Sequence, residues 1–195
     1  GGLTEEEFSD WLLDEQNRQW RNKVISDPYE PGSVFKIITA SAALDTGSVP
    51  MDVPMFYCMG YKEVAGNRIH SCNPAFIEVG QQTGAENFTT YFDRFGLGDL
   101  TGIDLPGEAD NEGMYYTLDD MGIAELSSSS FGQTFKVSGI QLITALSAAL
   151  NGGDLMQPYI VKQIIDSDHN IVETTEPTVR RQVISEETSA KICYM

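Results

Sequence analysis

The chain has 195 residues, of which 41% are hydrophobic, and this is enough apolar material to form the core of one ordinary domain. Its 12 basic and 29 acidic residues give a formal charge of −17, which argues against binding to nucleic acid or to anionic lipid surfaces. The sequence contains no run of about 18 apolar residues that could span a membrane, so any membrane anchor or export signal is expected outside this chain.

The first predicted element is an amphipathic helix over residues 5–21. Thr4 and Glu7 have the spacing of a capping box, and apolar residues, including Trp11 and Trp20, recur at helical intervals after it. We expect both tryptophans to anchor the core.

A second helix is predicted over residues 33–44, ending near Gly47. Apolar residues cover nearly every face of this segment, which is typical of a buried helix. Residues 48–72 have little periodicity and are predicted to form a long loop with one short strand at Met55–Tyr57.

Further helices are predicted from Pro74 to about Gln82 and around Phe88–Phe95. Residues 96–136 are expected to be mostly irregular, apart from one helical turn near Asp119–Ile123. After them, an Ala- and Leu-rich helix is predicted over residues 138–150.

The C-terminal part predicts a β-hairpin followed by a helix. Two β-rich runs, Tyr159–Ile165 and Ile171–Glu173, flank a polar stretch and have the pattern of hairpin strands. Ser185 is placed to cap a last helix through Tyr194.

The cysteines and histidines do not have the spacing of a metal site, and we expect no metal. A Cys58–Cys72 disulfide is one arrangement that their spacing allows, and free thiols at these positions and at Cys193 are the interpretation that we favour.

Ser33 and Lys36 have the spacing of a nucleophile and its base. A serine hydroxyl becomes nucleophilic when a base takes its proton, and a lysine can be that base if burial keeps it neutral. Three residues apart at a helix start, the two side chains lie on one face, and burial of the helix is expected to lower the pKa of Lys36. The spacing alone is weak evidence, and Ser33 as a simple N-cap is the alternative.

The residues around this pair resemble the nucleophile segment of penicillin-binding proteins, in particular the monofunctional class B type of cell division and sporulation. That segment is Tyr29-Glu30-Pro31-Gly32-Ser33-Val34-Phe35-Lys36-Ile37-Ile38-Thr39-Ala40, in which Ser33 and Lys36 match the S-x-x-K motif of the family. The resemblance implies that Ser33 is the nucleophile and Lys36 its base.

Ser71-Cys72-Asn73 matches the second motif of the family, S-x-N. The resemblance implies that Ser71 relays protons near Lys36 and that Asn73 binds either the lysine or the substrate amide. The alternative is that Ser71 or Asn73 caps the helix that starts at Pro74.

The resemblance covers most of the chain in the order of the family. It continues through Phe95–Gly98, Thr101–Glu108, Ser130–Val137, Asn151–Gly153 and Pro158–Val161. It implies an α+β, mostly α fold: the α-rich lobe of the serine transpeptidase and β-lactamase-like fold with a small β-hairpin, forming one partial domain over residues 1–195.

The third motif of the family, K-[ST]-G, is not found. Lys136-Val137-Ser138-Gly139 has one residue too many and lies in a segment that resembles a structural part of the family, so we interpret it as a coincidental match. The family places the true motif after the helix predicted from Ser185, and we expect it beyond Met195. We therefore expect most of the central sheet to be missing from this chain. One of the two N–H groups of the oxyanion hole is expected to be missing with it. Without that sheet, the residue 33–44 helix is expected to expose an apolar patch.

The resemblance implies a peptidoglycan D,D-transpeptidase that acts through an acyl-serine intermediate, without a cofactor, and that β-lactams inhibit covalently. The implied partners are peptidoglycan stem peptides, β-lactam antibiotics and other cell-wall synthesis proteins, at the extracytoplasmic face of the bacterial cell membrane. A β-lactamase or D,D-carboxypeptidase of the same fold is one alternative. A catalytically inactive structural or interaction module is the other.

Overall fold

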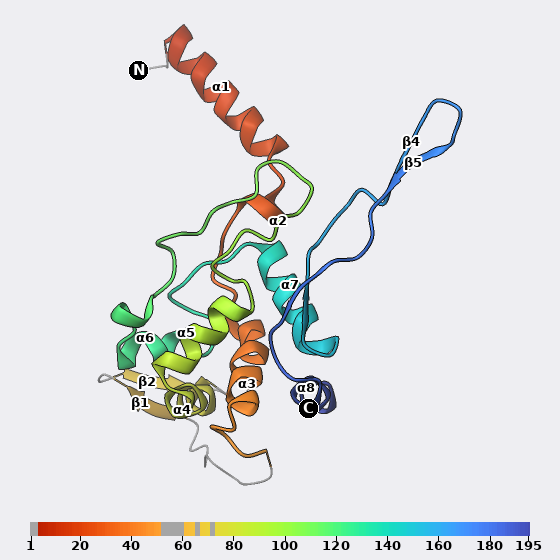
Figure 1. Ribbon diagram of the computed structural model, residues 1–195. Coiled ribbons are helices and arrows are strands. Elements are labelled where there is room, and N and C mark those ends of the chain that lie inside the picture. The colour runs from red at the N-terminus through yellow and green to blue at the C-terminus, as the bar shows by residue number, and fades with distance from the viewer. Residues whose placement is uncertain (1–3, 52–60, 65–66, 71–72) are drawn as a thin grey trace.

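The computed structural model describes residues 4–51, 61–64, 67–70 and 73–195, and its elements are labelled in Figure 1. Helices dominate these residues, as expected. They are α1 (Glu5–Trp20), α2 (Lys23–Ser26), α3 (Lys36–Asp45), α4 (Asn73–Thr83), α5 (Ala85–Arg94), α6 (Ile123–Ser129), α7 (Gly139–Leu150) and α8 (Glu186–Tyr194). Short 3-10 helices cover Gly32–Phe35 and Leu118–Asp120.

The strands of the described residues form antiparallel pairs only. These pairs are β1 (Tyr61–Val64) with β2 (Asn67–His70), β3 (Asp154–Met156) with β6 (Val179–Gln182), and β4 (Gln163–Ile165) with β5 (Ile171–Thr174). The β4–β5 hairpin confirms the prediction for the C-terminal part, although its first strand starts four residues later than expected. Figure 1 shows it extending away from the helices, and every residue of both strands is exposed.

Two of these pairs were not predicted. The loop expected over residues 48–72 contains β1 and β2, and β3 and β6 join the end of α7 to the segment before α8. Strands of three or four residues are too short to show a clear alternation of polar and apolar residues, and their pairing depends on the rest of the fold. The strand predicted at Met55–Tyr57 lies outside the described residues.

The α1 helix forms as predicted, but its tryptophans do not anchor the core. The Thr4 hydroxyl accepts from the Glu7 N–H and the Glu7 carboxylate accepts from the Thr4 N–H, which confirms the capping box. However, α1 buries none of its residues, and Trp11 and Trp20 are 50% and 74% exposed. Figure 1 shows α1 at one extremity of the molecule, where it does not pack against the helices around α3.

The core surrounds α3, which packs against α4, α5, α7 and α8. Phe35, directly before α3, is 1% exposed and contacts the ring of Phe135 edge-on with centroids 4.7 Å apart. Ile38, Ala42 and Ala43 of α3 are buried as well. The helix is described in full, and none of its large apolar side chains is exposed. Within the predicted residue 33–44 helix, Val34 is 48% exposed, whereas neighbouring helices cover the apolar side chains of α3, so the expected exposed patch is limited to Val34.

Buried amides hold the irregular segment between α5 and α7 in place. Asn111 is 1% exposed and donates to the carbonyl oxygens of Leu97, at 2.8 Å, and Lys136, at 3.0 Å. Gln141 of α7 donates to the Asn111 side-chain oxygen at 3.2 Å. These bonds satisfy backbone groups that have no helix or sheet partner. The segment is largely irregular as predicted, but α6 within it was missed.

Side-chain caps start the last two long helices where the sequence places them. Ser138 and Gln141 form a capping box at α7, and the Ser185 hydroxyl accepts from the Thr188 N–H at α8. A capped first turn satisfies backbone N–H groups that have no partner within the helix. Both helix predictions are confirmed.

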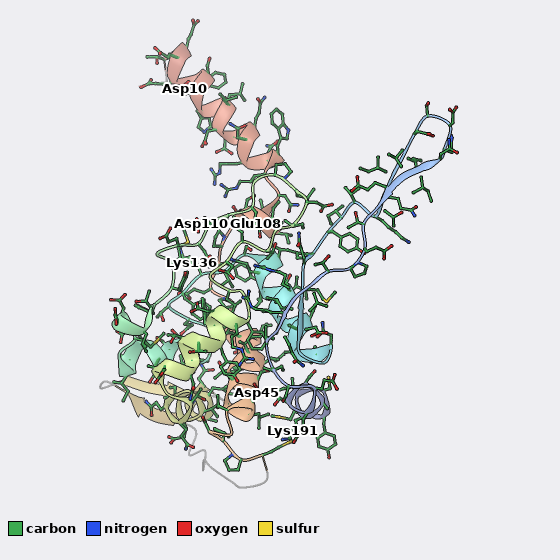
Figure 2. All side chains as sticks on the ribbon, in the orientation of Figure 1. Asp10, Asp45, Glu108, Asp110, Lys136 and Lys191 are labelled. Atoms are coloured by element: carbon green, nitrogen blue, oxygen red, sulfur yellow. The ribbon has the colours of Figure 1, made fainter. Side chains whose placement is uncertain are left out.

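Asp45, at the end of α3, joins three helices (Figure 2). Its carboxylate accepts from the Tyr91 hydroxyl of α5 at 2.6 Å, and from the Ser185 N–H and the Thr188 hydroxyl at the start of α8 at 2.9 and 2.8 Å. Burial acts to raise the pKa of Asp45, but these hydrogen bonds outweigh it and hold the pKa below 3.8. Burial, followed by the bond to Asp45, raises the pKa of Tyr91 to about 12.

Candidate active site

A tight turn places Ser33 at the surface directly beside the core. Gly32 has φ +61°, a conformation that side chains disfavour, and starts the 3-10 helix that contains Ser33. Ser33 is exposed, whereas Phe35 two residues later is buried. The buried ring therefore fixes the turn in the core while the hydroxyl stays accessible.

The Lys36 side chain donates to the Ser33 hydroxyl, with 3.1 Å between Nζ and Oγ. Lys36 is half-buried, and its Nζ lies 5.5 Å from the centroid of the Phe76 ring of α4. The Ser33 side chain caps neither the 3-10 helix nor α3. The simple N-cap interpretation of Ser33 is therefore wrong, and its hydroxyl faces the lysine that the spacing predicts.

The S-x-N motif is described only in part. Asn73 is the first residue of α4 and is half-buried. Because Phe76 lies one turn after Asn73 and contacts Lys36, the start of α4 lies near the Ser33–Lys36 pair. Ser71 lies outside the described residues, and the roles of Ser71 and Asn73 stay predictions.

The segment Ser130–Thr134, which we call the clamp segment, contacts the nucleophile turn from a distant part of the sequence. The Gly132 carbonyl accepts from the Gly32 N–H at 2.8 Å. The Ser130 carbonyl accepts from the Thr39 hydroxyl at 2.9 Å, and the Thr134 N–H donates to the Glu30 carboxylate at 3.1 Å. The family resemblance includes this segment, but no local pattern in the sequence predicts these contacts.

The coincidental K-[ST]-G match has a structural role. The Lys136 N–H donates to the Met114 carbonyl, and Val137 is fully buried and bridges to Tyr29 in the manner of a β-pair. Ser138 caps α7. These contacts agree with the interpretation that this match is not the third motif.

A cavity of about 530 Å³ lies beside the clamp segment. Glu30 and Thr134 form part of its wall, together with Tyr115, Tyr116 and Lys136, the last of which is labelled in Figure 2. A cavity of this size is typical of small-ligand sites. Its wall includes Glu30, three residues before Ser33, so it is adjacent to the nucleophile turn.

The described residues contain no cluster of three or more His, Cys, Asp or Glu side chains that could hold a metal ion. Cys193 is an exposed free thiol, whereas Cys58 and Cys72 lie outside the part of the chain that the structure describes. In that same part, no helix combines the length and the apolar character that crossing a bilayer requires.

Comparisons with known proteins show which family the chain resembles over nearly its whole length. Residues 5–195 match the family described as the penicillin binding protein transpeptidase domain. The chain is 41% identical over 193 residues to stage V sporulation protein D of Bacillus subtilis, covering 89% of this chain and 30% of that protein. It is 28% identical over 203 residues to the peptidoglycan D,D-transpeptidase PbpA of Mycolicibacterium smegmatis, covering 93% of this chain and 40% of that protein.

A solved structure shows the same fold. Penicillin-binding protein 3 of Mycobacterium tuberculosis, complexed with aztreonam, superimposes with a TM-score of 0.78 at 25% identity, over 92% of this chain and 44% of that one. The expected fold class, an α-rich part of the serine transpeptidase fold with small strands, is therefore confirmed. The chain spans about a third of the length of the curated relatives described above. It belongs to the penicillin-binding protein transpeptidase domain family.

Proposed function

We propose that this chain carries the nucleophile of a peptidoglycan D,D-transpeptidase, with Ser33 as the attacking group. The observation that carries the proposal is the 3.1 Å contact between Ser33 Oγ and Lys36 Nζ at the start of a buried helix, in a chain of this family. The name of the PbpA relative states the same activity for that protein.

In the first step, neutral Lys36 takes the Ser33 proton while Oγ bonds to the carbonyl carbon of a D-Ala–D-Ala peptide bond. The C–N bond breaks, and the terminal D-Ala leaves as an amine that receives the proton. In the second step, the amine of a neighbouring stem peptide bonds to the acyl carbon and the bond from that carbon to Ser33 Oγ breaks. The proton that the amine loses passes through Lys36 to Ser33 Oγ, which restores the hydroxyl. Ser71 is proposed to relay protons, and Asn73 to bind the substrate amide or Lys36.

The tetrahedral oxyanion of each step requires hydrogen-bond donors. The Ser33 N–H is one proposed donor, and a K-[ST]-G segment outside residues 1–195 is proposed as the other. One missing donor costs about 3–4 kcal/mol of barrier in known enzymes, which is about a hundred- to a thousandfold in rate. Residues 1–195 alone are therefore expected to acylate far more slowly than the full-length natural protein, and equal rates would contradict this assignment.

β-Lactams would acylate Ser33 by ring opening, since their amide takes the place of the D-Ala–D-Ala bond. Stem peptides and β-lactams are thus the proposed ligands. Other cell-wall synthesis proteins are proposed as partners, and the extracytoplasmic face of the bacterial membrane as the location. We propose that residues 1–195 are part of one transpeptidase domain.

The test is to incubate the full-length natural protein with a fluorescent penicillin and to locate the adduct by peptide mass spectrometry. We expect a stable adduct on Ser33 that is lost in Ser33→Ala, while thermal unfolding stays unchanged because Ser33 is exposed and caps no helix. Rapid turnover of penicillin would indicate a β-lactamase or carboxypeptidase instead. Absence of labelling in a folded protein would indicate a non-enzymatic module.

A further inference from the structure

The turn that carries Ser33 and the helix that carries Lys36 are held in place by different contacts. Lys36 is the first residue of α3, and the buried Ile38 and Ala42 fix that helix in the core. Ser33 instead follows Gly32, whose positive φ is a conformation that glycine adopts readily, and the buried Phe35 holds only the side of the turn after Ser33. The distance between the two reacting atoms therefore depends on what holds the turn.

Gly132 holds the turn by direct backbone contact. It is buried and has φ +85°, and a Cβ added to it would lie 2.0 Å from the Gly32 carbonyl oxygen and 2.7 Å from the Gly32 carbonyl carbon. Only a glycine at position 132 allows these two backbone segments to approach this closely and to form the hydrogen bond from the Gly32 N–H to the Gly132 carbonyl. Any side chain at position 132 must displace the residue directly before Ser33.

Thr134 provides a second contact and has a strained backbone. It has φ +68°, a region that β-branched residues rarely occupy. Its hydroxyl lies 2.8 Å from the Ser128 hydroxyl, and its N–H donates to Glu30 at 3.1 Å. Such strain persists where the surrounding structure enforces it, and it occurs frequently at functional sites. Glu30 lies three residues before Ser33, so the hydrogen bond from Thr134 fixes the beginning of the turn.

We propose that Glu30, Gly132 and Thr134 are positioning residues for Ser33. By attaching the turn to the clamp segment at Glu30 and at Gly32, they hold Ser33 Oγ at hydrogen-bonding distance from Lys36 Nζ. The inference rests on the proposed role of Ser33 as nucleophile. A displacement of about 1 Å at a reacting group can lower a rate about a hundredfold, so loosening this contact is expected to slow acylation specifically.

The first test compares Gly132→Ala with Gly84→Ala in the full-length natural protein. Gly84 has φ +80°, close to that of Gly132, but an added Cβ there meets no atom within 4 Å. Both variants place an alanine at positive φ, and only Gly132→Ala pushes on Gly32. Saturation kinetics with a fluorescent penicillin separate the acylation rate constant from the non-covalent dissociation constant, and thermal unfolding monitors the fold.

We expect Gly132→Ala to lower the acylation rate constant by at least about tenfold, and Gly84→Ala to leave it within about twofold of wild type. Equal acylation rate constants in the two variants would overturn the proposal. If the wild-type protein forms no adduct on Ser33, the proposed function itself fails. That outcome differs from one in which the wild type forms the adduct and the two variants acylate equally fast, which would exclude only the positioning role.

The second test does not depend on Gly132→Ala remaining folded. Glu30→Gln keeps a side-chain oxygen that can accept the Thr134 N–H, whereas Glu30→Ala removes it. We expect Glu30→Ala to lower the acylation rate constant about tenfold with little change in the dissociation constant, and Glu30→Gln to restore most of it. Wild-type acylation by Glu30→Ala, or equal losses in both variants, would contradict positioning through this bond.

Discussion

Helices α1 and α3 both carry large apolar side chains, yet only α3 is buried. The packing of α3 against α4, α5, α7 and α8 covers Ile38 and Ala42, whereas α1 leaves Phe8, Trp11 and Trp20 at least half exposed. Local pattern predicted both helices correctly. It also predicted the burial of α3 correctly, but it wrongly placed the α1 tryptophans in the core, because burial depends on which other elements lie within reach of the apolar face.

The difference in burial between the α3 region and α1 is tested by truncating one phenylalanine side chain in each. Phe35→Ala is expected to lower the free energy of unfolding by about 3–5 kcal/mol, because it leaves a cavity among packed aromatic rings. Phe8 of α1 is 50% exposed, and Phe8→Ala is expected to change stability by about 0.5 kcal/mol or less. Chemical denaturation measures both, and a similar loss in the two variants would show that a partner covers α1.

Two asparagines sharpen the contrast between the core and the projecting hairpin. Asn111→Ala leaves the buried carbonyls of Leu97 and Lys136 without their donor, which is expected to cost about 1–3 kcal/mol. Asn170, exposed beside the hairpin turn, donates to Asp166, and Asn170→Ala is expected to cost about 0.5 kcal/mol or less. If denaturation midpoints shift equally, the Asn111 network does not hold the irregular segment.

A smaller effect is expected from the pH dependence of Asp45, which joins α3 to α5 and α8. Its pKa is held below 3.8 in the folded protein, so the carboxylate contributes stability that is present above pH 3.8 and is lost as pH falls through the folded value. The stability difference between wild type and Asp45→Asn should therefore shrink below pH 3.8. Denaturation at a series of pH values checks this, with Asp10→Asn on α1 as a control for the lost charge. A constant difference down to pH 2 would contradict the role of Asp45.

Helix starts were predictable where a short sequence contains its own cap. Thr4, Ser138 and Ser185 each accept from the backbone N–H three positions later, and the caps at Thr4 and Ser185 were predicted. The serine-rich α6 was missed, because serines more often compete with helix backbone bonds than support them. In α6, the Ser127 hydroxyl donates to the Ile123 carbonyl one turn earlier.

The candidate site shows the same division between local and distant contacts. The Ser33–Lys36 contact follows from a three-residue spacing at a helix start, so the sequence alone indicates it. The Glu30–Thr134 contact joins residues that are 104 positions apart in the sequence. No local pattern predicts which distant segment will pack against the turn that carries Ser33. Positions with positive φ, such as Thr134, are visible only in the structure.

The central claim, that Lys36 activates Ser33, is tested most directly by Lys36→Arg. An arginine keeps the positive charge, but it cannot be deprotonated in a protein and so cannot take the Ser33 proton. The measurement is the time course of fluorescent penicillin labelling in the full-length natural protein, with Lys36→Ala as the matched variant. We expect Lys36→Arg to label as slowly as Lys36→Ala, at least about a hundredfold below wild type. Labelling of Lys36→Arg at the wild-type rate would contradict the Ser33–Lys36 mechanism.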